Sequence, residues 1–573
     1  MFPARGVLQA YGRQALTDRV ILDLAFDEAR LAAARAAGGT LHYIVVAAAL
    51  PAVPPVLAEC WPLALPGMHR LELDGGRTVV DIVLGDPEAL LLDITARVDE
   101  FHAPSAQAPL RALARLAVPG ALLVTVPGDE AWKRSLRAAG FSWDADTAPL
   151  QARYTSRKPQ PSRPAPPVRS AVVIGAGVAG AAACERLCAH GWDVTLVERH
   201  DGPAQEASGN RAGIFMPLLS RDDNIPTRLT RAAYLHALRR WQALGGMATD
   251  GSAPILGQQC GVLQLARDAQ HAALQKEVAE AWRYPVEYVR WLDAAQASAL
   301  LGSATPHGAW LFPQGGWANP ASVCRAMLAA CGGRLQRVFH AQALSLERKG
   351  DGWLVRGADV DTGHDRVLAE GAHVIVANGA GAMALSQTAP LPLYTMRGQV
   401  THLAADTFAA PPMVVCREAY LTPAMEGIAS VGATYDRTSD READRALWPA
   451  SQQENLARAR EILGAGRVPE APALAGRVGL RCMAPDRLPL VGTLPDHAAP
   501  GQPERLRDVP RHPGLHALLG YASRGLIWAP LAAELLVCQL EGLSSPIEAS
   551  LAGALDPGRF LLKSRRKTVV IAP

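Results

Sequence analysis

Short apolar runs alternate with Ala-rich segments of helical periodicity along much of this chain. The clearest succession is an apolar run at 171–174, a helical segment at 178–190 and a second apolar run at 193–197. Strands and helices that alternate in this way predict β-α-β units with a parallel sheet. Residues 1–150 show the same alternation, so the pattern predicts α/β architecture for the N-terminal part as well.

Two stretches depart from this alternation. Residues 151–169 are rich in Pro, Ser and basic side chains without apolar periodicity, which predicts an extended basic linker. Residues 260–315 and 391–475 are assigned to an antiparallel, substrate-facing layer, on the β-branched and aromatic runs after residue 391. The predicted domains are therefore 1–150 and 170–573, the second with this layer inside it.

Glycines mark the turn between the first strand and the helix of the second domain. Gly175, Gly177 and Gly180 stand in the pattern G-x-G-x-x-G directly after the strand. Such glycines permit a tight turn, let the backbone approach a pyrophosphate and let the helix pack close to the strand. Glu198 directly follows the second strand, about 20 residues after the glycines, at the position where a carboxylate binds ribose hydroxyls. Together they predict a dinucleotide with an unphosphorylated ribose, either FAD or NAD.

Composition narrows the class of protein. A chain of 573 residues with 49% hydrophobic and 19% charged residues is typical of a globular protein of several domains. Its nine cysteines are scattered without a C-x-x-C pair, which favours reduced thiols in a cytoplasmic protein and predicts no metal site. The longest apolar stretch, 41–57, is broken by prolines and too short for a bilayer, so we expect no membrane segment.

Further glycine-rich loops follow the dinucleotide turn. Residues 207–213 (ASGNRAG) come shortly after the second strand, and an ordinary flexible loop is the alternative to a flavin contact there. Gly379 ends a later apolar run, and a glycine-rich loop opens an apolar helix within 520–536. The candidate cofactor-binding residues are Gly175, Gly177, Gly180, Glu198, Ser208, Gly209, Asn210, Ala212, Gly213, Gly379, Ser523, Arg524, Gly525 and Leu526.

Several motifs occur in an order that resembles a known family. They are the glycine turn, ASGNRAG, a G-L-R-x-x-x-x-D-x-L-P-L-V-G segment (479–492) and S-R-G-L (523–526). With them, residues 170–573 resemble the FAD-dependent amine oxidoreductases related to D-amino-acid and glycine oxidases. QGGW, RGQV, YLTP and GATY make the resemblance closer to a family of bifunctional enzymes that modify the wobble uridine of tRNA.

That resemblance implies FAD as cofactor, tRNA as partner, and a defined reaction. The reaction is oxidative removal of the carboxymethyl group from 5-carboxymethylaminomethyl(-2-thio)uridine, which leaves 5-aminomethyl(-2-thio)uridine and glyoxylate. Arg481 occupies the position of a carboxylate-binding, catalytic arginine, and the alternative is a structural ion pair with Asp486. Backbone N–H groups of Arg524, Gly525 and Leu526, at a helix start, would stabilise negative charge on the reduced flavin.

The N-terminal half resembles a Rossmann-like methyltransferase but departs from it in three places. The loop after its first strand, 24–28 (LAFDE), lacks glycine, and no acid follows its second strand at 45–49. A loop that carries an aspartate in the family is shortened to 101–105, and only Asp86 remains as an adenine contact. These departures predict a methyltransferase-like domain without activity and put S-adenosylmethionine binding in doubt.

Three alternatives stay open at this point. The enzyme could be fully bifunctional and also methylate its product to 5-methylaminomethyl-2-thiouridine. It could instead oxidise free amino acids such as glycine or sarcosine. Residues 1–150 could also serve as a binding module that docks tRNA.

Overall fold

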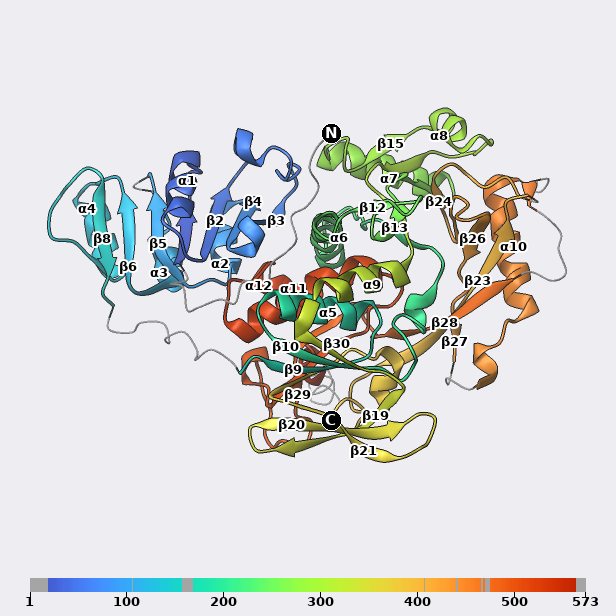
Figure 1. The fold of residues 1–573 in the computed structure, drawn as a ribbon. Coiled ribbons are helices and arrows are strands. Elements are labelled where there is room, and N and C mark those ends of the chain that lie inside the picture. The colour runs from blue at the N-terminus through green and yellow to red at the C-terminus, as the bar shows by residue number, and fades with distance from the viewer. Residues whose placement is uncertain are drawn as a thin grey trace, which may run out of the picture. The chain divides into compact units, whose positions relative to one another are not determined.

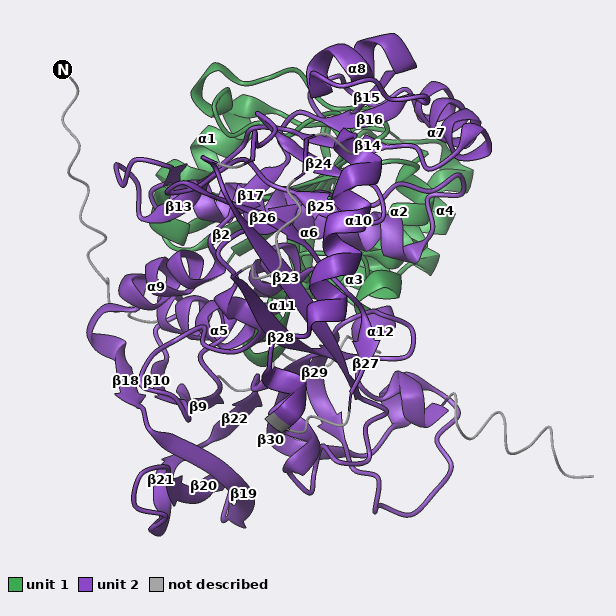
Figure 2. Ribbon diagram, turned by 90° about the vertical axis from the view of Figure 1, so that its right-hand side faces the viewer, with its two compact units in different colours: residues 1–167, 535–552 green, residues 168–534, 553–573 purple. Residues whose placement is uncertain are grey.

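The computed structural model describes residues 19–105, 107–156, 168–406, 408–438, 442–464, 467–468 and 475–562. The chain divides into two compact units, which Figure 2 colours separately and whose elements Figure 1 labels. Unit 1 comprises residues 1–167 and 535–552, and unit 2 comprises residues 168–534 and 553–573. Most of the predicted linker, 157–167, lies outside the described residues.

Unit 1 contains one eight-stranded sheet with the order β3-β4-β2-β1-β5-β6-β8-β7. Pairings among β4, β2, β1, β5 and β6 are parallel, and those that add β3, β8 and β7 are antiparallel. The strands are β1 (Arg19–Asp23), β2 (Leu41–Ala47), β3 (Gly67–Leu73), β4 (Thr78–Leu84), β5 (Val98–Ala103), β6 (Ala117–Thr125), β7 (Phe141–Ser142) and β8 (Leu150–Tyr154). The helices are α1 (Glu28–Ala36), α2 (Pro87–Asp93), α3 (Leu110–Leu116) and α4 (Glu130–Ala138).

The strand order reverses between β1 and β5, as in doubly wound α/β sheets. In such sheets the ligand crevice lies outside the carboxyl ends of the two strands at the reversal. In unit 1 this is the place of the loops 24–28 and 101–105. The predicted α/β architecture of this half is confirmed.

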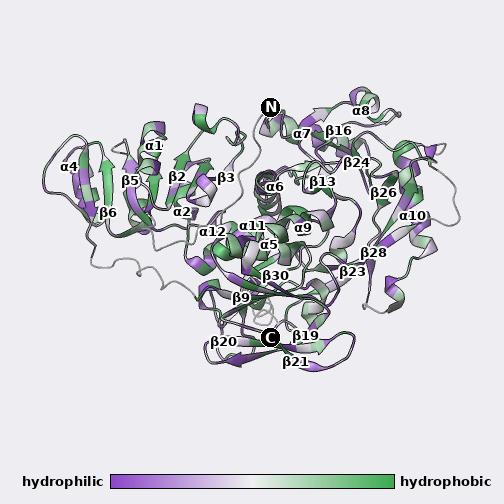
Figure 3. Cartoon of the chain, in the orientation of Figure 1, coloured by the Kyte–Doolittle hydropathy of each residue, from purple (hydrophilic) through white to green (hydrophobic). Residues whose placement is uncertain are grey.

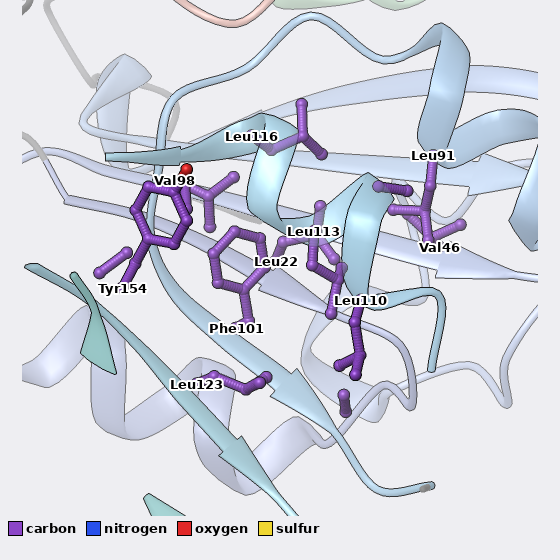
Figure 4. Close-up of a cluster of buried hydrophobic side chains, with 14 of the residues drawn as sticks. Leu22, Val46, Leu91, Val98, Phe101, Leu110, Leu113, Leu116, Leu123 and Tyr154 are labelled. Carbon is purple, nitrogen blue, oxygen red and sulfur yellow. The ribbon is translucent and has the colours of Figure 1, made fainter. Parts of the chain in front are cut away.

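Apolar side chains from strands and helices fill the core of unit 1. Phe101, Leu22 and Leu113 are fully buried in one cluster, which Figure 4 shows together with Tyr154 of β8. Leu150, Ala152 and Tyr154 all point into the core, because alternate residues of a strand share a face. The prediction that the linker begins at 151 is therefore wrong, and residues 151–154 belong to the sheet.

Residues 535–552 complete unit 1, although the sequence analysis assigns them to the second domain. The backbone N–H of Ser545 donates to Thr95 O (3.0 Å), and that of Ser550 donates to Asp93 Oδ1 (2.8 Å). The segment comes from the end of α11 (Gly525–Glu541) and the start of α12 (Ala549–Leu555). Helix α11 is hydrophobic along most of its length (Figure 3), a pattern that predicts burial but not the unit to which each part belongs.

A buried ion pair ties this segment to the edge of the unit 1 sheet. Arg70 donates from Nε to Asp81 Oδ1 (2.9 Å) and from Nη2 to Asp81 Oδ2 (2.7 Å). Arg70 Nη2 also donates to Ser544 O (3.0 Å), and His42 Nε2 lies 2.6 Å from Asp81 Oδ2. Burial alone would raise the pKa of Asp81, but Arg70 and His42 outweigh it and hold that pKa well below its ordinary value.

Unit 2 is organised around a six-stranded sheet with the order β18-β10-β9-β22-β30-β29, parallel except for β29. Its strands are β9 (Ser170–Ile174), β10 (Asp193–Val197), β18 (Leu335–Val338), β22 (His373–Val376), β29 (Leu490–Pro495) and β30 (Arg511–Leu519). Figure 1 shows α5 (Val178–Ala189), α9 (Pro320–Ala330) and α11 over one face of the sheet. A three-stranded sheet of β19 (Ala341–Lys349), β20 (Gly352–Asp359) and β21 (Asp365–Gly371) lies below the other face. The succession β9-α5-β10 is the strand, helix and strand predicted from the pattern.

The second layer of unit 2 is a nine-stranded, mostly antiparallel sheet. Its strands are β14 (Val262–Leu265), β15 (Arg290–Leu292), β16 (Ala309–Phe312), β23 (Tyr394–Ala404), β24 (Val414–Cys416), β25 (Tyr420–Leu421), β26 (Ile428–Gly432), β27 (Asp436–Arg437) and β28 (Gly476–Met483). The pair β14 and β24 is parallel, because a long crossover through the six-stranded sheet separates them in the chain. A four-stranded sheet consists of β11 (Gly213–Phe215), β17 (Gly316–Ala318), β13 (Ile255–Gln258) and β12 (Met247–Ala248).

The remaining helices of unit 2 are α6 (Ile225–Ala243), α7 (Ala269–Trp282), α8 (Ala294–Leu301) and α10 (Pro449–Leu463). Helix α10 packs against β23 and β26, on the outer side of the nine-stranded sheet in Figure 1. Within the described part of the chain, no helix combines the length and the apolar character needed to span a bilayer. The predicted fold class, two Rossmann-like parts with an antiparallel layer, is confirmed.

We predict that Asp81→Asn lowers the free energy of unfolding of unit 1 by about 3–5 kcal/mol, because it leaves the Arg70 guanidinium buried without its counter-charge. Urea unfolding, followed by a probe in unit 1, measures the change. Asp146→Asn, which removes the half-exposed partner of Lys133, serves as the control and should have a much smaller effect, because solvent screens exposed ion pairs. Equal effects of the two substitutions would contradict the prediction.

Candidate active site

A cavity of about 900 Å³ lies in unit 2, between its six-stranded and nine-stranded sheets. One wall is built from residues at the carboxyl ends of the parallel strands, including Ile174, Glu198 and Leu519. The opposite wall includes Tyr420 and Arg481 from the nine-stranded sheet. This volume is in the range of cofactor and drug-sized ligand sites, and the position is where open α/β sheets bind ligands.

The glycine turn lies at one end of the cavity. Gly175 has φ +100°, a left-handed conformation that favours glycine, and Gly177 is the N-cap of α5. A Cβ on Gly180 would lie 1.8 Å from Gly175 O, so the helix can meet the strand only through glycine. The Val178 N–H at the helix start donates to Ser208 Oγ (3.1 Å). The remaining free N–H groups of the first turn face a place suited to a pyrophosphate.

Glu198 directly follows β10 and lines the same cavity. The Ala176 N–H donates to Glu198 Oε2 (2.7 Å), and the His200 N–H donates to Oε1 (3.0 Å). Each carboxylate oxygen keeps acceptor capacity beyond these bonds, because an ionised carboxylate offers about four lone-pair sites. The carboxylate is therefore oriented by the backbone and able to accept from ribose hydroxyls.

The structure brings most of the predicted cofactor-binding residues to the cavity wall. Those that line it are Gly175, Gly177, Glu198, Ser208, Asn210, Gly213, Gly379, Ser523, Arg524, Gly525 and Leu526. Gly180, Gly209 and Ala212 do not line it.

Gly209 does not line the cavity but makes room for the side chain of an arginine. A Cβ there would lie 2.2 Å from Arg477 Nη2 and 2.6 Å from Ala204 O. That guanidinium nitrogen donates to Gln205 O (2.6 Å) and Glu206 O (2.8 Å). The missing side chain thus admits the arginine that holds the 205–209 loop in place.

Two buried polar atoms of cavity-lining residues have no hydrogen-bond partner among the described residues. They are Asn378 Oδ1, next to Gly379, and the Tyr521 hydroxyl, next to the start of α11. Both atoms are enclosed by protein and are not exposed to the cavity itself. The donors and acceptors that do line the cavity, at the glycine turn and at Glu198, fit a flavin dinucleotide.

Arg481 lies on β28, opposite Met396 of β23. Its Nη1 donates to Thr434 O (3.0 Å), and its guanidinium lies 4.3 Å from the centroid of the Tyr435 ring. It makes no ion pair with any described carboxylate, and Asp486 instead pairs with Arg559 through two bonds of 3.0 Å. The alternative of a structural Arg481–Asp486 pair is therefore wrong.

Glycine makes the room for this guanidinium. A Cβ on Gly398 of β23 would lie 2.2 Å from Arg481 Nη1 and Nη2, so any other residue at 398 would displace the arginine. Tyr420 lies close by, and burial raises its pKa to about 12 against the opposing charge of Arg481. Its hydroxyl stays protonated near neutral pH and can donate to an anion.

A second arginine enters the cavity from the start of α11. Arg524 Nη1 donates to Met216 O (3.3 Å), and the guanidinium forms no ion pair with a described carboxylate. Burial lowers its pKa, and the neighbouring Tyr435 and Cys416 oppose that shift. Sequence reasoning considered only the backbone of Arg524, and it missed Tyr420, Tyr435 and Asn378. The YLTP and GATY motifs were the available signal for the two tyrosines.

The crevice of unit 1 has no glycine turn in its loop 24–28, unlike the cavity of unit 2. Asp23, at the carboxyl end of β1, is fully buried and accepts hydrogen bonds from the Tyr43 hydroxyl, the Arg30 guanidinium and the Ala25 N–H. Asp86 is the N-cap of α2 and accepts from the Glu88 N–H (3.2 Å). Asp23 and Asp86 thus each accept hydrogen bonds from protein groups of unit 1.

Comparisons with known proteins cover both halves of the chain. The family described as FAD dependent oxidoreductase matches residues 170–539. A Burkholderia thailandensis protein named tRNA 5-methylaminomethyl-2-thiouridine biosynthesis bifunctional protein MnmC is 42% identical over 546 residues, which are 89% of this chain and 81% of that protein. The protein of the same name from Burkholderia multivorans is 41% identical over 92% of this chain and 83% of its own length.

Solved structures share the fold of unit 2 at low sequence identity. Glycine oxidase from Geobacillus kaustophilus has a TM-score of 0.50 at 20% identity, covering 65% of this chain and 94% of its own. L-proline dehydrogenase from P. horikoshii has a TM-score of 0.52 at 16% identity, covering 69% and 98%. At such identities the likeness establishes the fold alone.

We predict that Gly180→Ala weakens FAD binding by about 5- to 150-fold, because relieving a clash with a backbone oxygen costs about 1–3 kcal/mol. Flavin absorbance per protein after dialysis measures the loss. Gly333→Ala is the matched control, since a Cβ there meets no atom within 4 Å. The same flavin content in both variants would refute the prediction.

Proposed function

Because this chain belongs to the FAD dependent oxidoreductases and to the family of bifunctional tRNA 5-methylaminomethyl-2-thiouridine biosynthesis proteins, we propose a specific reaction for it. Unit 2 removes the carboxymethyl group from 5-carboxymethylaminomethyl(-2-thio)uridine of tRNA and leaves 5-aminomethyl(-2-thio)uridine and glyoxylate. The observation that carries the proposal is Arg481, a guanidinium without a carboxylate partner among the described residues, in a cavity that fits FAD. We also propose a cytoplasmic location, which a tRNA substrate supports.

Residues at the two ends of the cavity hold the two reactants. The glycine turn, Ser208, Glu198 and Asn378 would hold FAD, and its flavin supplies an acceptor for a hydride when bound. The modified arm of the uridine is an N-substituted glycine, so it presents a carboxylate, a methylene and an amine. Arg481 pairs with the carboxylate through its planar fork, and the Tyr420 hydroxyl donates to the same group.

Fixing the carboxylate determines where the chemistry occurs. As the hydride leaves the glycyl methylene, the lone pair of the neutral amine forms the C=N bond, so no side-chain base is required. Water then adds to the imine carbon and the C–N bond breaks, which releases glyoxylate and the primary amine. Arg481 is held in place by Thr434 O and by the space above Gly398, so it orients the methylene without rearrangement.

We propose that unit 1 does not methylate this product. Its crevice carries no glycine in the loop 24–28, and Asp23 is held by Tyr43 and Arg30. A carboxylate that is buried and bonded in this way cannot turn to a ligand without breaking charge-assisted hydrogen bonds. The S-adenosylmethionine site of the family is therefore not retained in working form.

Nucleoside analysis tests both parts of the proposal. Purified protein is incubated with tRNA that carries 5-carboxymethylaminomethyl-2-thiouridine, once without and once with S-adenosylmethionine, and the digested nucleosides are separated by mass. We expect 5-aminomethyl-2-thiouridine in both samples. A methylated nucleoside that forms only with S-adenosylmethionine would show that unit 1 is active, and an unchanged substrate in both samples would reject the oxidative reaction.

Arg481→Ala should raise the KM for the modified tRNA by about 10- to 150-fold, since a charge-assisted hydrogen bond contributes about 1.5–3 kcal/mol. The flavin content should stay at the wild-type level, because Arg481 lies at the substrate end of the cavity. Arg458→Ala, which removes an arginine of α10 that pairs with Glu454 and does not line the cavity, is the control and should leave KM unchanged. An unaltered KM in Arg481→Ala would exclude this arginine as the carboxylate-binding residue.

A further inference from the structure

The side chain of Tyr435 is half exposed even though the residue lines the cavity. Its exposed fraction is 50%. One face of the ring lies against the Arg481 guanidinium, 4.3 Å from the ring centroid. About half of the residue's surface is therefore free of protein contacts, although one face of the ring packs on Arg481.

The backbone on both sides of this ring is fixed by buried groups. Thr434 is fully buried, and its hydroxyl accepts from the Gln399 N–H (3.1 Å) and donates to Asp436 Oδ2 (3.0 Å). Arg397 is also fully buried, and its Nη2 donates to Gln399 Oε1 (2.7 Å). The segment that carries Tyr435 is thus anchored to β23, although the tyrosine itself is half exposed.

Arg397 is anchored in turn by a second set of contacts. Its guanidinium stacks 3.7 Å from the centroid of the Trp448 ring, and its Nη2 and Nε donate to Ala446 O (2.7 Å) and Asp444 O (2.8 Å). Arg397 therefore holds the loop before α10 to strand β23, and its register partner is Asp436, the residue after the tyrosine. A ring presented by such a support loses little conformational entropy when a ligand packs on it.

The geometry of the substrate brings its pyrimidine to this ring. Four single bonds separate the carboxylate carbon from C5 of the uracil, a span of about 5 Å at ordinary bond lengths of about 1.5 Å. With the carboxylate on Arg481, the uracil comes within reach of a ring whose centroid is 4.3 Å from that guanidinium. Flat bases stack favourably on aromatic side chains, and an adjacent guanidinium strengthens such a site.

We propose that Tyr435 is the specificity residue that stacks on the pyrimidine of the substrate and so selects a nucleoside-borne glycine over a free amino acid. This inference rests on the proposed function, because it names the residue that binds the pyrimidine of that substrate, outside the carboxylate pocket. A free N-methylglycine would fill the Arg481 pocket but leave the tyrosine surface uncovered.

Two ligands distinguish the contribution of Tyr435 to substrate binding from that of Arg481. The KM for 5-carboxymethylaminomethyluridine, as the free nucleoside, reports on the ring and the carboxylate together. The Ki of N-methylglycine, used as a competitor in the same assay, reports on the carboxylate and amine alone. In Tyr435→Ala we expect the KM for the nucleoside to rise about 5- to 150-fold, while the Ki of N-methylglycine stays within about twofold.

Matched variants show whether the ring itself is responsible. Tyr435→Phe keeps the aromatic face and should restore the nucleoside KM to within about threefold of wild type. Tyr394→Ala removes another tyrosine of this sheet that has an arginine, Arg437, 5.6 Å over its ring but does not line the cavity, so KM should not change. Flavin content and melting temperature confirm that each variant is folded.

The possible failures are distinguishable. If wild-type protein does not oxidise the nucleoside or the tRNA, the proposed function fails and this inference fails with it. If wild type is active and Tyr435→Ala keeps its nucleoside KM, only the stacking role is overturned. Equal losses for the nucleoside and N-methylglycine would also overturn it, because they would mean that Tyr435 acts through Arg481.

Discussion

The carbonyl oxygen of Gly175 lies so close to Gly180 that no side chain can stand between strand β9 and helix α5. This approach places the first turn of α5 at the edge of the sheet, where its free N–H groups face the cavity. Ser208 and Glu198 are then positioned by bonds to backbone N–H groups of the same turn. The position of the cofactor end, and hence of everything aligned with it, depends on this one backbone contact.

At the other end of the cavity the decisive property is uncompensated positive charge. Arg481 and Arg524 approach Tyr435 from different elements, and neither has a carboxylate partner among the described residues. A guanidinium without a carboxylate partner favours an anion beside it, and the carboxylate of the proposed substrate would supply one.

Local patterns predicted the parts of the structure that depend on neighbouring residues in the chain. The strand, glycine turn, helix and second strand after Ser170 could be read directly because each element follows the last. Arg481 could be proposed from a motif, but the space for its guanidinium is made by Gly398, which lies far away in the sequence on the neighbouring strand β23. The orphan oxygen of Asn378 and the exposed ring of Tyr435 likewise follow from tertiary burial, which no local pattern carries.

Because residues 535–552 belong to unit 1, this unit cannot complete its folding before they are synthesised. Unit 1 begins to emerge from the ribosome first, yet the segment that binds Arg70 and Thr95 is synthesised only after nearly all of unit 2. At about 5–20 residues per second, the interval between Pro167 and Leu535 lasts roughly 20–70 s. During this time the ion pair of Arg70 and Asp81 lacks its C-terminal cover. The two units therefore cannot mature strictly in the order of their synthesis, and a cut within the linker would separate unit 1 from part of its own structure.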